Sequence, residues 1–143
     1  MTEIKNTPYI SAGYELEILY NVDTNSSQDG ISTMREELAK SFVRLDEIET
    51  LQDDWNGNGA SAFSADIIDR VRELVSTLNI QPIILPTARD SIQMEYENEK
   101  GDYLELELFE GGRLKLFSYS HDGVSETRDI SIAEADKVVC SFY

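Results

Sequence analysis

The spacing of the apolar residues changes between the two halves of this chain, near Pro82, and that change constrains its fold more than any other feature. Between residues 31 and 78, apolar residues recur every three or four positions, which places them on one face of a helix. Beyond Pro82 they recur every second position, as in strands with one buried face. Because helical and strand patterns are segregated along the chain, the sequence predicts an α+β fold.

Two amphipathic helices are predicted over residues 31–78, as a helical hairpin. The first is about five turns long and carries on one face Ile31, Met34, Leu38, Phe42, Leu45, Ile48 and Leu51. Thr33 and Glu36 resemble a capping box at its start. The second follows Ser64, a candidate N-cap, and Asn79 is predicted to end it in a left-handed conformation.

Residues 83–143 are predicted to form an antiparallel meander and a C-terminal element. Three strands are indicated by alternating apolar residues at Ile92, Met94 and Tyr96, at Leu104, Leu106 and Leu108, and at Leu114 and Leu116. A one-residue slip would turn these side chains to water, so the register must place Leu106 opposite both Met94 and Leu116. A weaker strand is expected over 124–130. Residues 132–142 are predicted to form a closing helix, with a strand at 138–142 as the alternative.

The two helices are therefore expected to pack on one face of the antiparallel sheet, within a single domain over residues 1–143. Residues 1–30 are predicted to hold a strand at 14–20, for which a helix start is the alternative, and a flexible linker at 23–30. Residues 82–86 are interpreted as a proline-containing link between helices and sheet.

Charge and composition exclude several classes of function. The chain has 12 basic and 28 acidic side chains, a net charge of −16, and such a surface repels nucleic acid and anionic membranes. Cys140 is the one cysteine and His121 the one histidine, so an internal disulfide and the usual zinc ligand sets are excluded. Cys140 follows two valines and is predicted to lie in the core. No signal peptide or membrane helix is indicated, so a cytoplasmic location is expected.

The first candidate site is the loop between the predicted helices. Asp54, Asn56 and Asn58, followed by Gly59, match the opening of an EF-hand calcium loop. The match fails at position 12, which is Ala65 where a bidentate glutamate is required. We therefore favour a structural interpretation, in which the glycines form a tight turn and Trp55 packs between the helices and the sheet. Calcium binding and an exposed Trp55 that anchors a partner are the alternatives.

The second candidate site is a cluster of carboxylates on the outer face of the sheet. The predicted register places Glu95 opposite Glu105, with Glu97 and Glu107 nearby and Lys115 opposite Glu107. Like charges across a strand pair are unfavourable, so compensation is expected from Lys115, Arg113, a metal or a basic partner. Acid–base catalysis would need a cleft, whereas an outward strand face is usually open to water.

No residue set for catalysis or for a cofactor is recognised. His121 lies in a predicted Asp-Gly turn, and no serine lies in a nucleophile elbow. Gly111 and Gly112 join two strands rather than a strand and a helix, so they do not form a phosphate loop. We therefore expect a non-enzymatic protein without a cofactor.

The loop and the first strand of the meander together resemble a loose group of small uncharacterised bacterial and phage-borne proteins. Those proteins carry a W-[DN]-G-x-G-A loop, here Trp55-Asn56-Gly57-Asn58-Gly59-Ala60, and downstream a strand of the form G-I-x-L-E-W. The resemblance covers roughly residues 45–118, and at the strand this chain has Ser91, Met94 and Tyr96 instead. It implies a prokaryotic source and a shared fold, and no activity is established for the group.

The sequence thus favours a small, acidic, cytoplasmic protein-interaction or regulatory module, with an origin in a mobile element as an accompanying hypothesis. Its expected partner is another protein with a basic surface, and neither a nucleic acid nor a membrane. Trp55 and the carboxylates Glu95, Glu97, Glu105 and Glu107 are the predicted partner-binding residues. An acidic mimic of nucleic acid and a weak calcium binder at residues 54–65 are the two alternatives.

Overall fold

A computed structural model describes residues 26–143 of the chain. The strand predicted at 14–20 lies outside the described residues. The chain divides after Glu36 into two units, Met1–Glu36 and Glu37–Tyr143, and this division falls inside helix α2 (Ser26–Glu49). Of the first unit, the structure describes the beginning of α2; the second unit is described by itself below.

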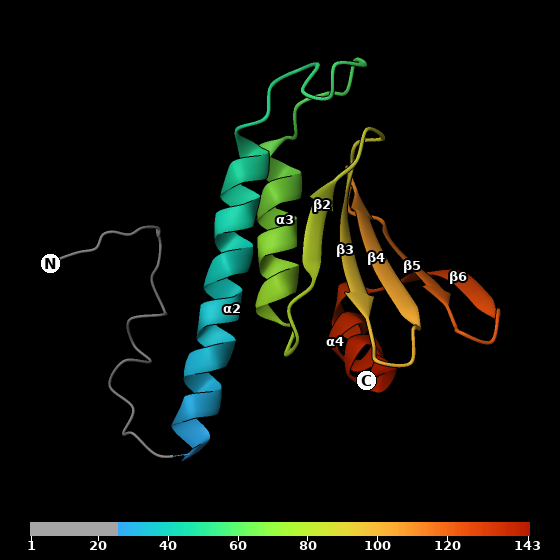
Figure 1. The fold of residues 1–143 in the computed structure, drawn as a ribbon. Coiled ribbons are helices and arrows are strands. Elements are labelled where there is room, and N and C mark those ends of the chain that lie inside the picture. The colour runs from blue at the N-terminus through green and yellow to red at the C-terminus, as the bar shows by residue number, and fades with distance from the viewer. Residues whose placement is uncertain (1–25) are drawn as a thin grey trace, which may run out of the picture. The chain divides into compact units, whose positions relative to one another are not determined.

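The second unit consists of the rest of α2, a second helix, a five-stranded sheet and a closing helix (Figure 1). The elements after α2 are α3 (Ala65–Ser76), β2 (Ile83–Pro86), β3 (Ser91–Glu97), β4 (Tyr103–Phe109), β5 (Leu114–Tyr119), β6 (Ser125–Ile130) and α4 (Ile132–Phe142). Each strand pairs antiparallel with its neighbours in chain order, which makes the sheet a meander. The predicted α+β class and the closing helix are confirmed.

The predicted register of the central strands is confirmed. Leu106 lies opposite both Met94 and Leu116, and Leu108 lies opposite Leu114. These five side chains are almost inaccessible to solvent. One-sided burial explains this register, because a slip of one residue would turn this whole apolar set to water.

The interpretation of residues 82–86 as a link is wrong, since Ile83–Pro86 forms the edge strand β2. Ile84 lies opposite Met94 and is buried, whereas Ile83 is exposed. Four residues are too few to show a clear alternating pattern. Pro86 is tolerated at this position because an edge strand has one side without ladder hydrogen bonds.

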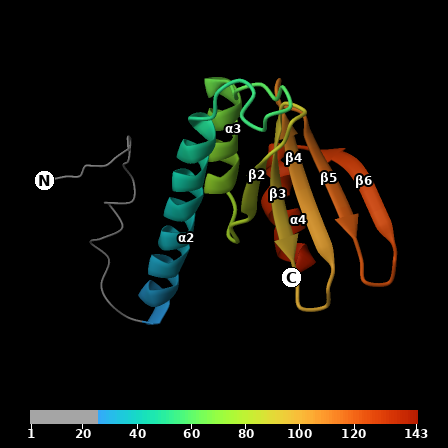
Figure 2. The same ribbon diagram turned by 45° about the horizontal axis from the view of Figure 1, so that its top comes forward.

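All helices of the second unit cover the same face of the sheet. Leu45 and Ile48 of α2, the buried residues of α3, and Ala135 and Val139 of α4 join one core with the alternating apolar residues of the strands. In both views α4 lies behind β3 and β4 (Figure 1, Figure 2). The other face is covered by no helix of the described unit. We call this surface the open face; its central residues are Gln93, Glu95, Glu97, Tyr103, Glu105, Glu107, Phe109, Lys115, Phe117 and Tyr119.

Of the three helix ends predicted from the sequence, at Thr33, Ser64 and Asn79, the structure confirms only the N-cap at Ser64. The Ser64 hydroxyl caps α3, accepting a hydrogen bond from the Ile67 N–H at 3.2 Å. Asn79 does not end α3, because Thr77 is its right-handed C-cap, with its N–H bonded to the carbonyls of Leu74 and Val75. α2 already begins at Ser26, inside the predicted linker, so the proposed cap at Thr33 lies within the helix.

Burial on α2 and α4 also departs from the apolar pattern. Leu45 and Ile48 are fully buried, whereas Met34, in the first unit, keeps 47% of its surface exposed. Cys140 was predicted in the core and is exposed. It follows Val139 by one residue, about 100° around the helix, so its side chain leaves the buried stripe of α4. Periodicity identifies side chains that share a helix face, but burial depends on what that face contacts.

Candidate functional site

The Trp55 loop is held together by its own side chains. The Asp54 carboxylate accepts the Gly59 N–H at 2.7 Å. The Asn56 side-chain oxygen accepts the N–H groups of Asn58 and Ala60 at 2.8 and 3.1 Å. The backbone of Asp54 is left-handed, with φ of 69°. These contacts close the chain into a tight turn between α2 and α3.

Trp55 itself is half-buried at the end of the core. Its ring centroid lies 6.1 Å from that of Phe63, and its indole N–H donates to the Ser61 carbonyl at 3.0 Å. Its polar atom therefore has a partner and its ring packs on the core cluster. This geometry favours the structural interpretation of Trp55 over that of an exposed anchor.

The same contacts bear on the calcium alternative. Oxygens of Asp54 and Asn56 that would serve a cation already accept backbone N–H groups, so binding would have to displace those hydrogen bonds. Within residues 26–143, histidine, cysteine and carboxylate side chains form no group suited to hold a metal ion. In this geometry the side chains of Asp54 and Asn56 stabilise the loop by binding its backbone N–H groups.

The predicted carboxylate pair is present on the open face. Glu95 lies directly opposite Glu105, and Glu97 follows on the same strand. None of the three forms an ion pair with any residue of the described chain. The Tyr103 hydroxyl donates to Glu105 at 3.1 Å. Partial burial raises the pKa of Glu105, and the charges of Glu107 and Glu95 also raise it. The Tyr103 hydrogen bond and the charge of Lys115 lower it, so the net shift is upward but opposed.

The fourth predicted carboxylate, Glu107, is not solvated as expected. It is fully buried, although it lies on the open face opposite Lys115. Arg89 donates to its Oε2 at 3.0 Å, and the Ser91 hydroxyl donates to the same oxygen. Its Oε1 accepts no hydrogen bond from the described residues, and the Lys115 ammonium lies 3.5 Å away. Two cations and a hydroxyl therefore compensate this charge, and it is not available to a partner.

Strand alternation did not identify Arg89, because it comes from the turn between β2 and β3. That turn is closed by a bond from the Thr87 N–H to the Ser91 carbonyl at 3.0 Å. Asp90 has a left-handed backbone, with φ of 60°. The sequence indicated that the carboxylate row needs a compensating cation, and Lys115 and Arg113 were the predicted candidates. Lys115 does lie 3.5 Å from Glu107, but Arg89 was not among the candidates.

Aromatic and apolar side chains surround the unpaired carboxylates. Tyr103 and Phe117 pack with ring centroids 6.3 Å apart, and 49% of Tyr119 is exposed. Ile83, opposite Glu95 on the β2 edge, is 66% exposed. This half of the open face forms what we call the acidic–aromatic patch, which consists of Ile83, Glu95, Glu97, Tyr103, Glu105, Phe117 and Tyr119.

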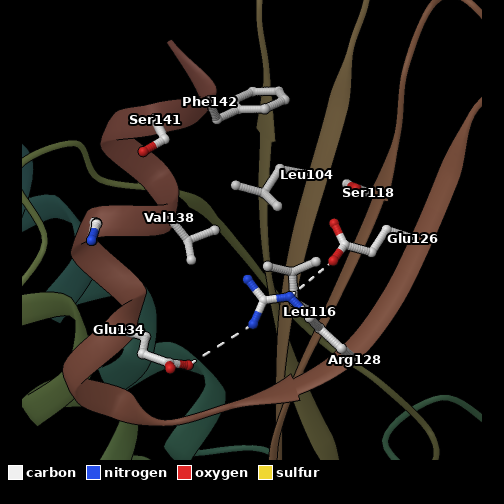
Figure 3. Close-up of a pocket in the computed structure, with 10 residues that line it drawn as sticks. Leu104, Leu116, Ser118, Glu126, Arg128, Glu134, Val138, Ser141 and Phe142 are labelled. Atoms are coloured by element: carbon white, nitrogen blue, oxygen red, sulfur yellow. Dashed lines mark hydrogen bonds and ion pairs between the residues drawn. The ribbon is translucent and has the colours of Figure 1, made fainter.

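A hollow of about 470 Å³ lies on the opposite face of the sheet, between α4 and the last three strands (Figure 3). Apolar side chains that include Leu104 and Val138 line it. The Arg128 guanidinium lies between the carboxylates of Glu126 and Glu134, at 2.9 and 4.0 Å. The ten described residues of the lining include no histidine or cysteine. The arginine of the lining is thus already paired with two carboxylates, and no sequence pattern predicted the hollow.

The histidine lies in the predicted turn and forms an ion pair with Asp102. The Asp102 carboxylate accepts from the His121 backbone N–H at 2.8 Å and lies 2.7 Å from its Nδ1. This hydrogen bond, aided by the charge of Asp122, raises the pKa of His121 above its ordinary 6.5.

We expect an NMR titration of the His121 ring to give a pKa above 6.5, and Asp102→Asn to lower it. The raised pKa means that protonated His121 favours the folded state. This stabilisation is complete below pH 6.5 and is lost as the pH rises through the folded-state pKa. Asp122→Asn is the matched control and should lower the pKa less. An unchanged titration in the Asp102 variant would contradict the assignment.

Comparisons with protein-family models, with curated proteins and with solved structures returned no match to this chain. Helices of the described part lack the length and apolar character that crossing a bilayer requires.

Proposed function

We propose that this chain is a protein-interaction module that binds a basic protein partner through the acidic–aromatic patch. The observation that carries the proposal is the pair of carboxylates Glu95 and Glu105, opposite each other and unpaired with any described cation. Like charges directly opposite each other across a strand pair destabilise a sheet. A lysine or arginine of a partner would remove this repulsion, so binding would relieve a cost that the free protein carries.

The composition of the patch supports a protein partner. Aromatic side chains are enriched at protein interfaces, and Tyr103, Phe117 and Tyr119 lie among the carboxylates. Tyrosine and phenylalanine faces also attract guanidinium and ammonium groups. Exposed Ile83 adds apolar surface at the edge. An arginine-rich or lysine-rich surface of a partner could form cation–π contacts with the rings and ion pairs with the carboxylates.

The net charge of −16 supports a partner other than nucleic acid, because phosphate would be repelled. A nucleic-acid-binding enzyme, whose basic groove would accept the carboxylates, is the narrower form of this proposal. The cytoplasmic location and the bacterial or phage-borne origin are parts of the same proposal, which includes no catalytic step.

The test is capture of the partner by the tagged full chain from a nuclease-treated bacterial lysate. Binding is compared at about 0.1 M and about 1 M salt, where the screening length falls from ~10 to ~3 Å. The test variant is Glu95→Gln/Glu105→Gln. The control Glu36→Gln/Glu73→Gln removes the same charge from exposed positions on α2 and α3.

We expect the wild type and the control to retain one specific protein at low salt, and the test variant to lose it. The test variant should be at least as stable as the wild type, because it removes a like-charge pair, so loss of binding cannot be attributed to unfolding. Equal capture by both variants, or no specific protein at either salt concentration, would overturn the proposal.

A further inference from the structure

Strand β6 is the last strand of the sheet and has a free edge. The strand order ends at β6, and both views show no described segment beside it (Figure 1, Figure 2). The Ser120 N–H donates to the Val124 carbonyl at 2.8 Å, so these two residues form a hydrogen-bonded pair at the start of the β5–β6 ladder. Hydrogen-bonded and non-hydrogen-bonded pairs alternate along an antiparallel ladder, so every second residue of β6 from Val124 points its backbone groups toward β5. The backbone groups of Ser125, Thr127 and Asp129 therefore point away from β5, toward the free edge.

The sequence of this edge is complementary to itself. Two β6 strands can pair antiparallel about a two-fold axis at Thr127. Thr127 then lies opposite Thr127 of the second copy, and Ser125 lies opposite Asp129 of the second copy. This register pairs every outward N–H and C=O of the three residues, because all three fall on hydrogen-bonded positions.

The side chains on the helix-covered face agree with the same register. Glu126 lies opposite Arg128 of the second copy, and Arg128 opposite Glu126. Val124, which is 68% exposed, lies opposite Ile130. Along this face the four cross-strand pairs are, in order, an apolar pair, two pairs of opposite charge and a second apolar pair. Apolar pairs and pairs of opposite charge both stabilise a sheet.

Neighbouring registers are disfavoured by charge. A shift of two residues is the smallest that keeps the outward backbone groups paired. It places either Glu126 opposite Glu126 of the second copy or Arg128 opposite Arg128. Both arrangements bring like charges together, so charge selects the register centred on Thr127.

We propose that β6 is the contact through which two copies of this chain associate, joining their sheets edge to edge. The Glu126–Arg128 ion pair within one chain does not oppose this, since both side chains are about half exposed and exchange partners at little cost. One short strand buries less surface than a permanent dimer needs, and two chains of −16 repel. The dimer is therefore weak and depends on concentration.

The alternative is that the charges of β6 prevent association, because charged side chains on an edge strand commonly keep sheets from pairing edge to edge. The two uses give opposite results when the charges are changed one at a time. If the charges protect, any reversal leaves a monomer. If they select a second copy, single reversals block self-association and complementary reversals restore it.

The experiment is sedimentation of the full chain from about 10 μM to about 1 mM. We expect the wild type to dimerise within this range. Arg128→Glu and Glu126→Arg should each weaken self-association at least about tenfold. An equimolar mixture of these two variants should associate again, and so should the double exchange Glu126→Arg/Arg128→Glu. Thr127→Pro should also give a monomer, because it removes an N–H that is not used within the sheet.

Circular dichroism of each variant controls for folding, and Glu73→Arg at an exposed position on α3 is the control matched to the charge change of Glu126→Arg. A wild type that stays monomeric throughout the range would overturn the proposal. So would a dimer that both single reversals leave intact, or single reversals whose mixture does not associate. The edge and the acidic–aromatic patch share no residue, so this test is independent of the proposed function.

Discussion

Replacement of Arg89 and Lys115 together by methionine is expected to lower the free energy of unfolding by about 3–5 kcal/mol at pH 7. The double variant leaves the fully buried Glu107 carboxylate with the Ser91 hydroxyl as its one described partner. Arg89 is 59% exposed, and methionine keeps an apolar stem at both positions, so the replacement removes little apolar burial. The cost arises because an ionised carboxylate is held away from water without a compensating cation.

Urea denaturation of the double variant measures this cost. The matched comparison is the triple variant Arg89→Met/Lys115→Met/Glu107→Leu, which removes the carboxylate as well. We expect it to recover most of the lost stability, because an apolar set of similar volume often replaces a buried ion cluster without loss. Ser91 keeps its hydrogen bond to Thr87 at 2.6 Å in the triple variant. A triple variant as unstable as the double variant would show that packing, rather than charge, is what Arg89 and Lys115 supply.

Leu106→Ala should lower the free energy of unfolding by about 3–4 kcal/mol. Leu106 is fully buried at the centre of the sheet, opposite both Met94 and Leu116. The truncation removes buried methyl groups and leaves a cavity that the paired strands cannot easily close, because their ladders hold the backbone in place.

Ile83→Ala is the control for this prediction, because Ile83 is 66% exposed on the β2 edge. Chemical denaturation should show a change of at most about 1 kcal/mol for the control. Similar losses at both positions would mean that the core does not lie on the face assigned here.

The elements that the sequence predicted correctly are those whose evidence is local. The meander follows from alternation, and its register follows because Met94, Leu106 and Leu116 all require the same side. The Ser64 cap was also predictable, since it depends on residues within one helical turn. The opposition of Glu95 and Glu105 came with the register, so the charged part of the candidate site was visible before the structure.

The predictions that failed concern what a side chain meets in space. Glu107 shares its strand and its face with Glu105, yet the Arg89 side chain from a neighbouring turn reaches it and it is buried. Cys140 lies in an apolar run, yet the orientation of α4 leaves it exposed. The short strand β2 was missed because four residues, the last of them Pro86, show no clear period.

By itself, the sequence determined the α+β class and the order and register of the central strands β3, β4 and β5, because hydrophobic periodicity and turn chemistry act between residues close in the chain. The tertiary structure alone decided which carboxylates stay unpaired, which face no described helix covers, and which edge of the sheet remains free. Those features depend on the packing of α4 and on the turn that carries Arg89. Contacts between distant segments set burial and charge compensation, and no local pattern encodes them.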